Sequence, residues 1–191
     1  GASAELYERG DDLEYHAYQF IHTEHPEEIY KNMKFDVIIG NPPYHISDGG
    51  DKKLKTRSRG SAVPLYPEFV EQAKKLRPRY LIMITPSRWF TSGRGLNIFR
   101  DKMLSDDRLR IIVDYPLSSE WVSYFLWVRD SRGDCKVITR RNQKESCLER
   151  PLLEKGSDVF IRFNEAIPIL RKVLSFNDDS FKSQVSSQKP F

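Results

Sequence analysis

The residues best suited to chemistry are Asn41-Pro42-Pro43-Tyr44, which directly follow a short apolar run. The side-chain oxygen of Asn41 and the backbone carbonyl of Pro42 are two hydrogen-bond acceptors, one for each N–H of an exocyclic amino group. Such a nitrogen on adenine is a poor nucleophile, because its lone pair is delocalised into the ring, until two acceptors hold it pyramidal. Proline restricts φ at positions 42 and 43, so the acceptors are placed with little freedom. The motif therefore fits the activation of an amino group.

Tyr44 adds a flat face on which an extruded base can stack. The reaction requires neither a metal nor a strong general base, because the departing proton becomes acidic once the nitrogen is alkylated. The alternative is a rigid proline turn that only ends a strand. We favour the chemical interpretation, because the four-residue match arises by chance in about one chain in a thousand of this length at average composition.

A buried strand must position this motif. Residues 35–40 are short, apolar and rich in β-branched types, as expected for a strand buried on both faces, and the two prolines end it. Two more strands are predicted at 80–85 and 109–114, and helices at 66–76, 96–104 and, after Asn164 as N-cap, up to 174. Residues 121–129 and 135–140 are predicted to pair as an antiparallel hairpin joined at 131–134. This order indicates an α/β sheet with an antiparallel edge, and ligands of such sheets bind at the carboxyl ends of strands.

The composition is that of a globular domain, with 39% hydrophobic and 30% charged residues among 191. No apolar run approaches the roughly 20 residues that span a bilayer, and residues 1–10 lack the features of a signal peptide. Cys135 and Cys147 have no disulfide-framework or metal-ligand spacing. We therefore expect two free thiols, no metal and a cytoplasmic location.

Charge is unevenly distributed along the chain. Residues 1–30 hold eight acidic residues and one basic residue, a charge of −7, and the total of +4 leaves +11 for residues 31–191. A basic body suits a polyanionic partner, although ordinary surface charge is an equal alternative. Five basic residues crowd the loop after the motif and are candidates for phosphate contacts: Lys52, Lys53, Lys55, Arg57 and Arg59. The alternative for these five residues is a solvated loop. Arg88 and Arg94 follow the next strand end, on the same rim, and are further candidates.

The run Asp36 to Tyr44 resembles the catalytic motif of amino-methyltransferases that use S-adenosylmethionine. More narrowly, most of the chain resembles the adenine-specific methylases of bacterial restriction–modification systems, the type IIG-like group. The similar stretches are Phe35 to Asp48, Tyr66 to Leu76, Thr85 to Phe90, Val113 to Pro116, Val122 to Trp127, and Phe160 to Ala166, which resembles the run into that group's target-recognition region. The resemblance implies a Rossmann-like catalytic domain, S-adenosylmethionine as methyl donor, base flipping in double-stranded DNA, and adenine N6 as acceptor. It makes Asn41, Pro42, Pro43 and Tyr44 the catalytic residues, with Asn41 and Pro42 next to the cofactor.

Two departures from this group limit the expectation. The glycine-rich cofactor loop that lies upstream of the catalytic strand is absent, and Asp11 is only a weak candidate for a cofactor contact, for which we favour a plain acidic turn. A longer glycine-containing loop is also usual before the strand that starts near Trp121. Either this loop is shortened, or residues are absent between Glu120 and Trp121, which we favour.

The resemblance also implies a stacking aromatic near residues 121–127. Period-two alternation places Phe125 and Trp127 on one face and Tyr124 on the other. Phe125 and Trp127 are candidates for a second wall of the base pocket, although core packing is the favoured role for at least two of the aromatic residues in this strand. His45 is a further candidate for lining the pocket, without a catalytic role.

We therefore expect an acidic leader (1–30), the C-terminal part of a methyltransferase catalytic domain (31–150) and a connection to a target-recognition region (151–191). The predicted function is methylation of adenine N6 in DNA. The alternatives are methylation of a protein glutamine or of RNA, or a DNA-binding or specificity part that is inactive alone. No Pro-Asp with a following Glu-x-Lys is present, so a restriction nuclease would be a fused or associated partner outside these residues.

Overall fold

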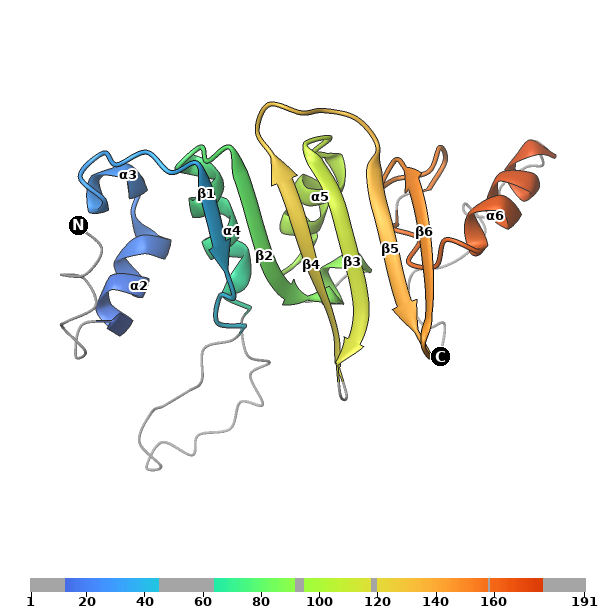
Figure 1. Cartoon of the computed structure of the whole chain (residues 1–191), viewed down its shortest axis with the longest axis horizontal. Coiled ribbons are helices and arrows are strands. Elements are labelled where there is room, and N and C mark those ends of the chain that lie inside the picture. Colours follow the sequence, from blue (N-terminus) through green and yellow to red (C-terminus); the bar gives the residue numbers. More distant parts are fainter. Residues whose placement is uncertain (1–12, 45–63, 92–94, 118–119, 158, 177–191) are drawn as a thin grey trace, which may run out of the picture.

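The computed structural model describes residues 13–44, 64–91, 95–117, 120–157 and 159–176. In these residues one mixed sheet has the strand order β1-β2-β4-β3-β5-β6 (Figure 1). The strands are β1 (Val37–Gly40), β2 (Tyr80–Pro86), β3 (Leu109–Leu117), β4 (Glu120–Val128), β5 (Cys135–Arg141) and β6 (Lys144–Arg150). The helices are α2 (Leu13–His22), α3 (Pro26–Ile29), α4 (Tyr66–Lys75), α5 (Asn97–Ser105) and α6 (Ala166–Ser175), with a 3-10 helix, η1 (Ser87–Phe90).

The strand directions bring one set of ends together. β1 and β2 are parallel, β4 runs antiparallel between β2 and β3, and β3 is parallel to β5. The carboxyl ends of β1, β2, β3 and β5 therefore meet at one edge of the sheet, which we call the carboxyl edge and which lies at the bottom of Figure 1. The predicted α/β class is confirmed, and the motif at residues 41–44 lies at this edge.

The predicted hairpin between residues 121–129 and 135–140 is wrong. β4 instead lies between β2 and β3 and pairs antiparallel with both, and its register with β3 begins at Leu117↔Glu120. After β4 the chain crosses over, and β5 pairs parallel with β3. The C-terminal hairpin is β5–β6, joined at Asn142 and Gln143, whose φ values of 49° and 62° match a two-residue type I′ turn. β6 escaped prediction because its sequence, KESCLER, is mostly polar.

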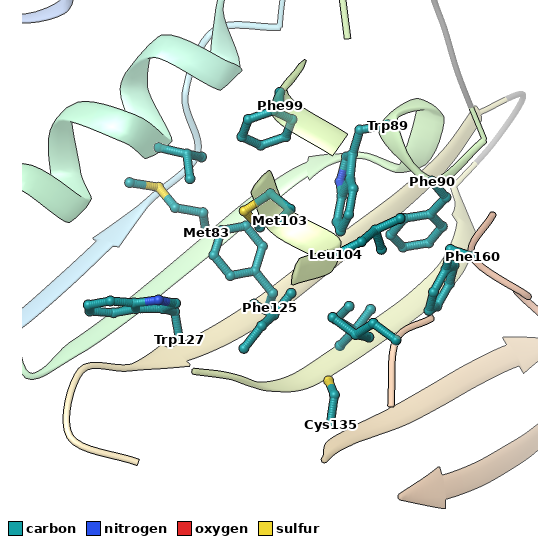
Figure 2. Packing of buried hydrophobic residues seen from close by; sticks show 14 of the residues in the cluster. Met83, Trp89, Phe90, Phe99, Met103, Leu104, Phe125, Trp127, Cys135 and Phe160 are labelled. Carbon is teal, nitrogen blue, oxygen red and sulfur yellow. The ribbon is translucent and has the colours of Figure 1, made fainter. Parts of the chain in front are cut away.

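Helices cover one face of the sheet and enclose the core there (Figure 2). In Figure 1 α4 lies behind β1 and β2, and α5 lies behind β4 and β3. Trp89, Phe90, Phe99, Phe125 and Trp127 are almost fully buried in this layer. At about 25 cal/mol per Å² of apolar surface, burial of such large side chains dominates the stability of this layer. No helix among the described residues has the length and apolar character to cross a membrane.

β1 departs from the expectation of a strand buried on both faces. Val37 is 48% and Ile39 73% exposed, because in the described residues nothing covers that face of β1 and only β2 pairs with it. The sheet is thus open at this side.

Candidate functional site

The motif leaves β1 at the carboxyl edge. β1 pairs with β2 from Val37↔Tyr80 to Gly40↔Met83, so the chain enters Asn41 directly from a hydrogen-bonded strand. Asn41 and Pro43 are exposed, whereas Pro42 is buried. The side-chain amide of Asn41 is therefore open to an incoming group, while the residue after it is held by packing.

Tyr44 is fixed against the start of α4. Its carbonyl oxygen accepts a hydrogen bond of 3.1 Å from the backbone N–H of Leu65. Its ring meets the buried ring of Tyr66 edge to face, with centroids 6.5 Å apart, and Tyr66 meets Phe99 in the same way at 5.7 Å. Tyr44 itself is half-buried, so the core supports the ring from one side and part of it remains accessible.

A row of buried polar side chains crosses the sheet just behind the carboxyl edge. It contains Thr85 of β2, Ser123 of β4, Asp114 of β3 and Thr139 of β5, each at most 4% exposed. The register pairs Thr85 with Ser123, Ser123 with Asp114, and Asp114 with Thr139. Buried polar groups usually have hydrogen-bond partners. Asp114 and Thr139 receive theirs from two segments that pack on the row, whereas the hydroxyls of Thr85 and Ser123 have no hydrogen-bond partner among the described residues.

Asp114 is the centre of these contacts. The hydroxyl of Ser87, the first residue of η1, donates to its Oδ1 at 2.5 Å, and Nε of Arg162 forms an ion pair with its Oδ2 at 2.9 Å. Burial raises the pKa of the Asp114 carboxyl, and the Ser87 hydrogen bond and the Arg162 charge oppose this shift. Thr139 adds a contact beside Asp114, because its Oγ1 donates to the backbone carbonyl of Arg162 at 3.0 Å.

Arg162 also lies close to two aromatic rings. Its guanidinium carbon is 4.5 Å from the ring centre of Trp121 and 5.5 Å from that of Phe90. Trp121 is half-buried and meets Phe163 edge to face at 6.2 Å. Sequence reasoning missed Arg162 as a site residue, although it lies within the run Phe160 to Ala166 that resembles the approach to a target-recognition region.

Asn164 has a different role from the predicted N-cap. α6 is preceded by Glu165, which makes no side-chain cap. The Asn164 amide instead donates to the carbonyl of Val137 at 2.9 Å, and its oxygen accepts from Nε of the fully buried Arg150 at 3.2 Å. The segment before α6 is thereby tied to β5 and β6.

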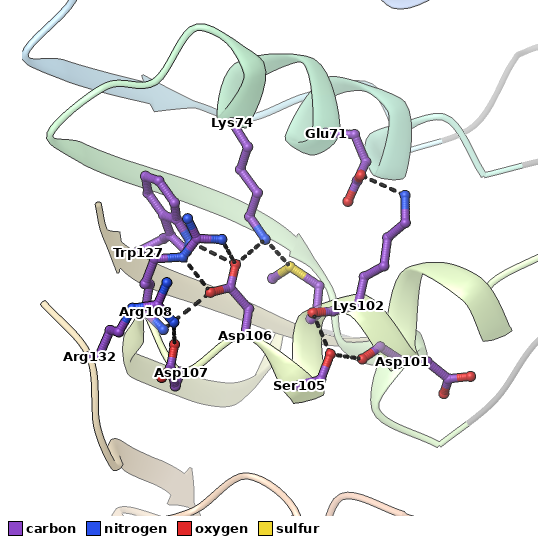
Figure 3. A network of polar contacts seen from close by, with 11 residues as sticks. Glu71, Lys74, Asp101, Lys102, Ser105, Asp106, Asp107, Arg108, Trp127 and Arg132 are labelled. Atoms are coloured by element: carbon purple, nitrogen blue, oxygen red, sulfur yellow. Dashed lines mark hydrogen bonds and ion pairs between the residues drawn. The ribbon is translucent and has the colours of Figure 1, made fainter. Parts of the chain in front are cut away.

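The structure does not support base stacking by Phe125 and Trp127. They share one face, as the alternation predicted, but that face is the core, where they are 0% and 2% exposed. Trp127 also lies at the opposite edge, where its indole N–H donates to Oδ2 of Asp106 at 2.9 Å (Figure 3). Neither ring has a face open to a base, and Trp121 is the aromatic residue of β4 nearest the carboxyl edge.

Arg88, in η1 beside the motif, is exposed at the carboxyl edge. The other predicted contacts lie outside the described residues: Asp11, His45, Lys52, Lys53, Lys55, Arg57, Arg59 and Arg94. Their roles stay predictions. Within the described part, no three His, Cys, Asp or Glu side chains are grouped to hold a metal ion.

Comparison with known proteins identifies the family to which this chain is similar. Residues 2–121 match the Eco57I restriction-modification methylase family. A Mycoplasma pneumoniae protein described as an uncharacterized adenine-specific methylase is 31% identical over 175 residues, covering 83% of this chain and 40% of that protein. The chain thus spans less than half of the length of this curated relative.

Distant likenesses to solved structures also exist. The type IIG restriction endonuclease BpuSI aligns with 55% of this chain and 15% of its own, at 18% identity and a TM-score of 0.41. A type I restriction-modification methyltransferase subunit from Streptococcus thermophilus aligns with 84% of this chain and 35% of its own, at 14% identity and a TM-score of 0.42.

Proposed function

Since the chain belongs to the Eco57I restriction-modification methylase family, we propose that its protein methylates N6 of adenine in double-stranded DNA, with S-adenosylmethionine as methyl donor. The observation that carries the proposal is the motif Asn41 to Tyr44 at the carboxyl end of β1, with an exposed asparagine amide and a buried proline behind it. A restriction nuclease, fused or associated, is a proposed partner.

Asn41 and Pro42 act on the target amino group. The Asn41 side-chain oxygen and the Pro42 carbonyl each accept one N–H, which draws the nitrogen lone pair out of conjugation and aims it away from the ring. S-adenosylmethionine supplies an electrophilic methyl group when bound. The nitrogen forms the new N–C bond as the S–C bond breaks, and it then releases one proton to water. Asn41 and Pro42 suit this task because they leave the strand as uncharged acceptors.

Tyr44 holds the base during this step. A base inside a duplex does not expose its amino group to the motif, so the adenine must be extruded. The accessible part of the Tyr44 ring offers a stacking surface, and its contact with Tyr66 keeps the ring from turning away. Phe125 and Trp127 are left out of this proposal because they are buried.

The test uses the full-length protein with labelled S-adenosylmethionine and three acceptors: duplex DNA, RNA and glutamine-containing peptides. We expect label on adenine N6 of duplex DNA. Loss of a preorganised hydrogen bond costs about 3 kcal/mol, so Asn41→Ala lowers the methylation rate a hundredfold or more and changes DNA affinity little. Asn97→Ala, at an exposed asparagine of α5, is the matched control and keeps the rate. Label on RNA or peptide alone, or an unchanged rate for Asn41→Ala, contradicts the proposal.

A further inference from the structure

We propose that a groove at the far end of the carboxyl edge binds the sugar–phosphate backbone of duplex DNA through Arg141 and Lys144. The groove lies between the β5–β6 turn and the start of α6, with a volume of about 600 Å³. We call it the hairpin groove and define it by Thr139, Arg141, Lys144, Ser146, Phe163 and Ile169. The inference rests on the proposed function, because it places a second DNA contact away from the catalytic motif.

The hairpin register gathers four polar side chains on one wall of the groove. Arg141 pairs with Lys144 and Thr139 pairs with Ser146, and directly opposed residues of two antiparallel strands project to the same face. The N-terminal part of α6 and the residue before it form the other wall, with Ile169 67% exposed. The groove thus combines donors for phosphate oxygens with an apolar wall for sugar carbons.

Arg141 and Lys144 are the cations that this hairpin presents to the groove. Both are exposed. Their neighbours Arg140 and Glu145 form an ion pair of 2.6 Å on the opposite face of the hairpin, so the nearest carboxylate of the hairpin already has a partner. Glu165 in the other wall is the one acidic lining residue, which leaves a net positive groove. Charge complementarity therefore points to a phosphate chain as occupant.

Arg141 is oriented for this task. Its guanidinium carbon lies 5.5 Å from the ring centre of Phe163. An arginine stacked on an aromatic ring keeps the N–H groups in its plane available, and these match two phosphate oxygens in a fork geometry. Phe163 is itself in contact with Trp121, and the Arg162 guanidinium lies against the Trp121 ring. The groove is thereby linked to Asp114, the ion-pair partner of Arg162.

The groove is held in shape before any ligand arrives. The two-residue turn at Asn142 and Gln143 fixes the twist of the hairpin. Thr139 binds the carbonyl of Arg162, and the Asn164 amide donates to the carbonyl of Val137 and, at 3.4 Å, to Oγ of Ser146. Both walls are therefore tied together, and binding costs little ordering of the protein.

The position of the groove sets which phosphates it can reach. β5 is four strands away from β1 in the sheet order, and strands lie about 4.8 Å apart, so the groove is about 19 Å from the motif. The carboxyl end of β1 and the β5–β6 turn both lie at the carboxyl edge (Figure 1). Arg88 belongs to η1, which follows β2 and therefore comes between them in the sheet order. A duplex that runs along the carboxyl edge rises about 3.4 Å per base pair, so the phosphates that reach the groove lie about five or six base pairs from the target adenine.

The first experiment measures the salt dependence of duplex affinity for the full-length protein, without cofactor. Each lost phosphate contact removes about 0.9 from the slope of log K against log salt, so Arg141→Ala/Lys144→Ala reduces it by about 1.8. Arg141→Gln/Lys144→Gln, which keeps the side-chain stems, gives the same reduction. Lys75→Ala/Lys155→Ala removes two exposed lysines at the opposite edge and leaves the slope unchanged. A full slope in both groove variants, or an equal loss in the control, overturns the proposal.

The second experiment locates the contact on the DNA. A neutral methylphosphonate placed about five or six base pairs from the target adenine lowers wild-type affinity and leaves the affinity of the groove variant unaltered. Equal losses for both proteins overturn the assignment of these phosphates to the groove. Affinity is measured without turnover, so the groove and the proposed function can fail separately. If the wild-type protein methylates duplex DNA but the groove variant keeps the full salt slope, only the proposed groove is rejected. A wild-type protein with no affinity for duplex DNA rejects the proposed function and the groove together.

Discussion

Asp114 and Arg162 form an ion pair of 2.9 Å that joins β3 to the segment leading into α6. The carboxylate is fully buried and the arginine side chain is 24% exposed, so the charge on Asp114 depends on its two partners, Ser87 and Arg162. The pair fixes a segment from the C-terminal part of the chain to the carboxyl edge that also carries Asn41. This contact links the motif's sheet to the run that resembles the approach to a target-recognition region.

We expect Arg162→Ala to lower the free energy of unfolding by about 3 kcal/mol at neutral pH, because it leaves a buried carboxylate without its cation. Burial already raises the pKa of Asp114, and losing Arg162 raises it further. A carboxyl whose pKa is higher in the folded protein binds more protons there, so stability falls as pH rises. The deficit of the variant is therefore greatest near neutral pH and shrinks as pH falls through that raised pKa. Urea denaturation across this range measures it.

Arg132→Ala is the control for this variant. Arg132 pairs with Asp107 at 2.8 Å, but both side chains are exposed, at 69% and 48%. Such pairs contribute at most about 1 kcal/mol. An Arg162→Ala deficit no larger than that of Arg132→Ala, or one independent of pH, would show that Asp114 does not depend on Arg162.

A second network, at the edge opposite the motif, should control acid stability (Figure 3). Oδ2 of Asp106 lies 3.2 Å from Nζ of Lys74, and Arg108 and Trp127 also donate to this carboxylate. Burial alone would raise the pKa of Asp106, but hydrogen bonds from Arg108, the Lys74 charge and the Trp127 N–H hold it well below the usual range. A lowered pKa stabilises the fold above the unfolded value of about 3.9, and this contribution is lost as pH falls toward the folded value.

Asp106→Ala should therefore cost about 3 kcal/mol at neutral pH, since it leaves Lys74 and the Trp127 N–H without their partner. The variant should also lose less additional stability than the wild type between about pH 4 and about pH 2. Asp107→Ala, at the adjacent and exposed aspartate, serves as its matched control and should cost at most about 1 kcal/mol. Equal costs for the two variants would refute the assigned role of Asp106.

Much of this fold followed from local pattern. The strand before Asn41 and the strand before Pro86 were predicted because apolar β-branched runs and prolines act within a few residues. The pairing partners of β4 could not be predicted from local pattern. An apolar run such as Trp121 to Arg129 is compatible with several neighbouring strands, and non-local contacts decide which strands it pairs with. β6 has too few apolar residues to be recognised, and it forms because β5 offers it a ladder and a two-residue turn.

The site shows the same division. Asn41 to Tyr44 could be found because the motif is contiguous. The contacts around Asp114 could not, because they come from four separated segments, which supply Ser87, Asp114, Trp121 and Arg162. Alternation placed Phe125 and Trp127 on one face but could not say that this face is the core. Burial is decided by where α4 and α5 pack, which no single strand encodes.

We expect this chain on its own to bind S-adenosylmethionine weakly or not at all. The glycine-rich loop that holds the cofactor in similar proteins is absent from the sequence, and Val37 and Ile39 of β1 stand exposed on a face that nothing in the described residues covers. Calorimetric titration of the 191-residue chain measures this directly. A dissociation constant in the micromolar range, roughly −8 kcal/mol, would show that these residues contain a sufficient cofactor site.

Tyr44→Ala should separate base extrusion from phosphate binding in the full-length protein. The ring is supported by Tyr66 at 6.5 Å and is only half-buried, so its removal deletes a stacking surface worth roughly 1–3 kcal/mol per base. We expect slower methylation and a smaller rise in fluorescence from 2-aminopurine at the target position, because fewer bases are held outside the duplex. The salt dependence of DNA binding should stay unchanged, since no phosphate contact is lost. Tyr44→Phe keeps the ring and should retain the fluorescence change. If Tyr44→Phe is as defective as Tyr44→Ala, the hydroxyl and not the ring face is what the reaction requires, and the stacking role is wrong.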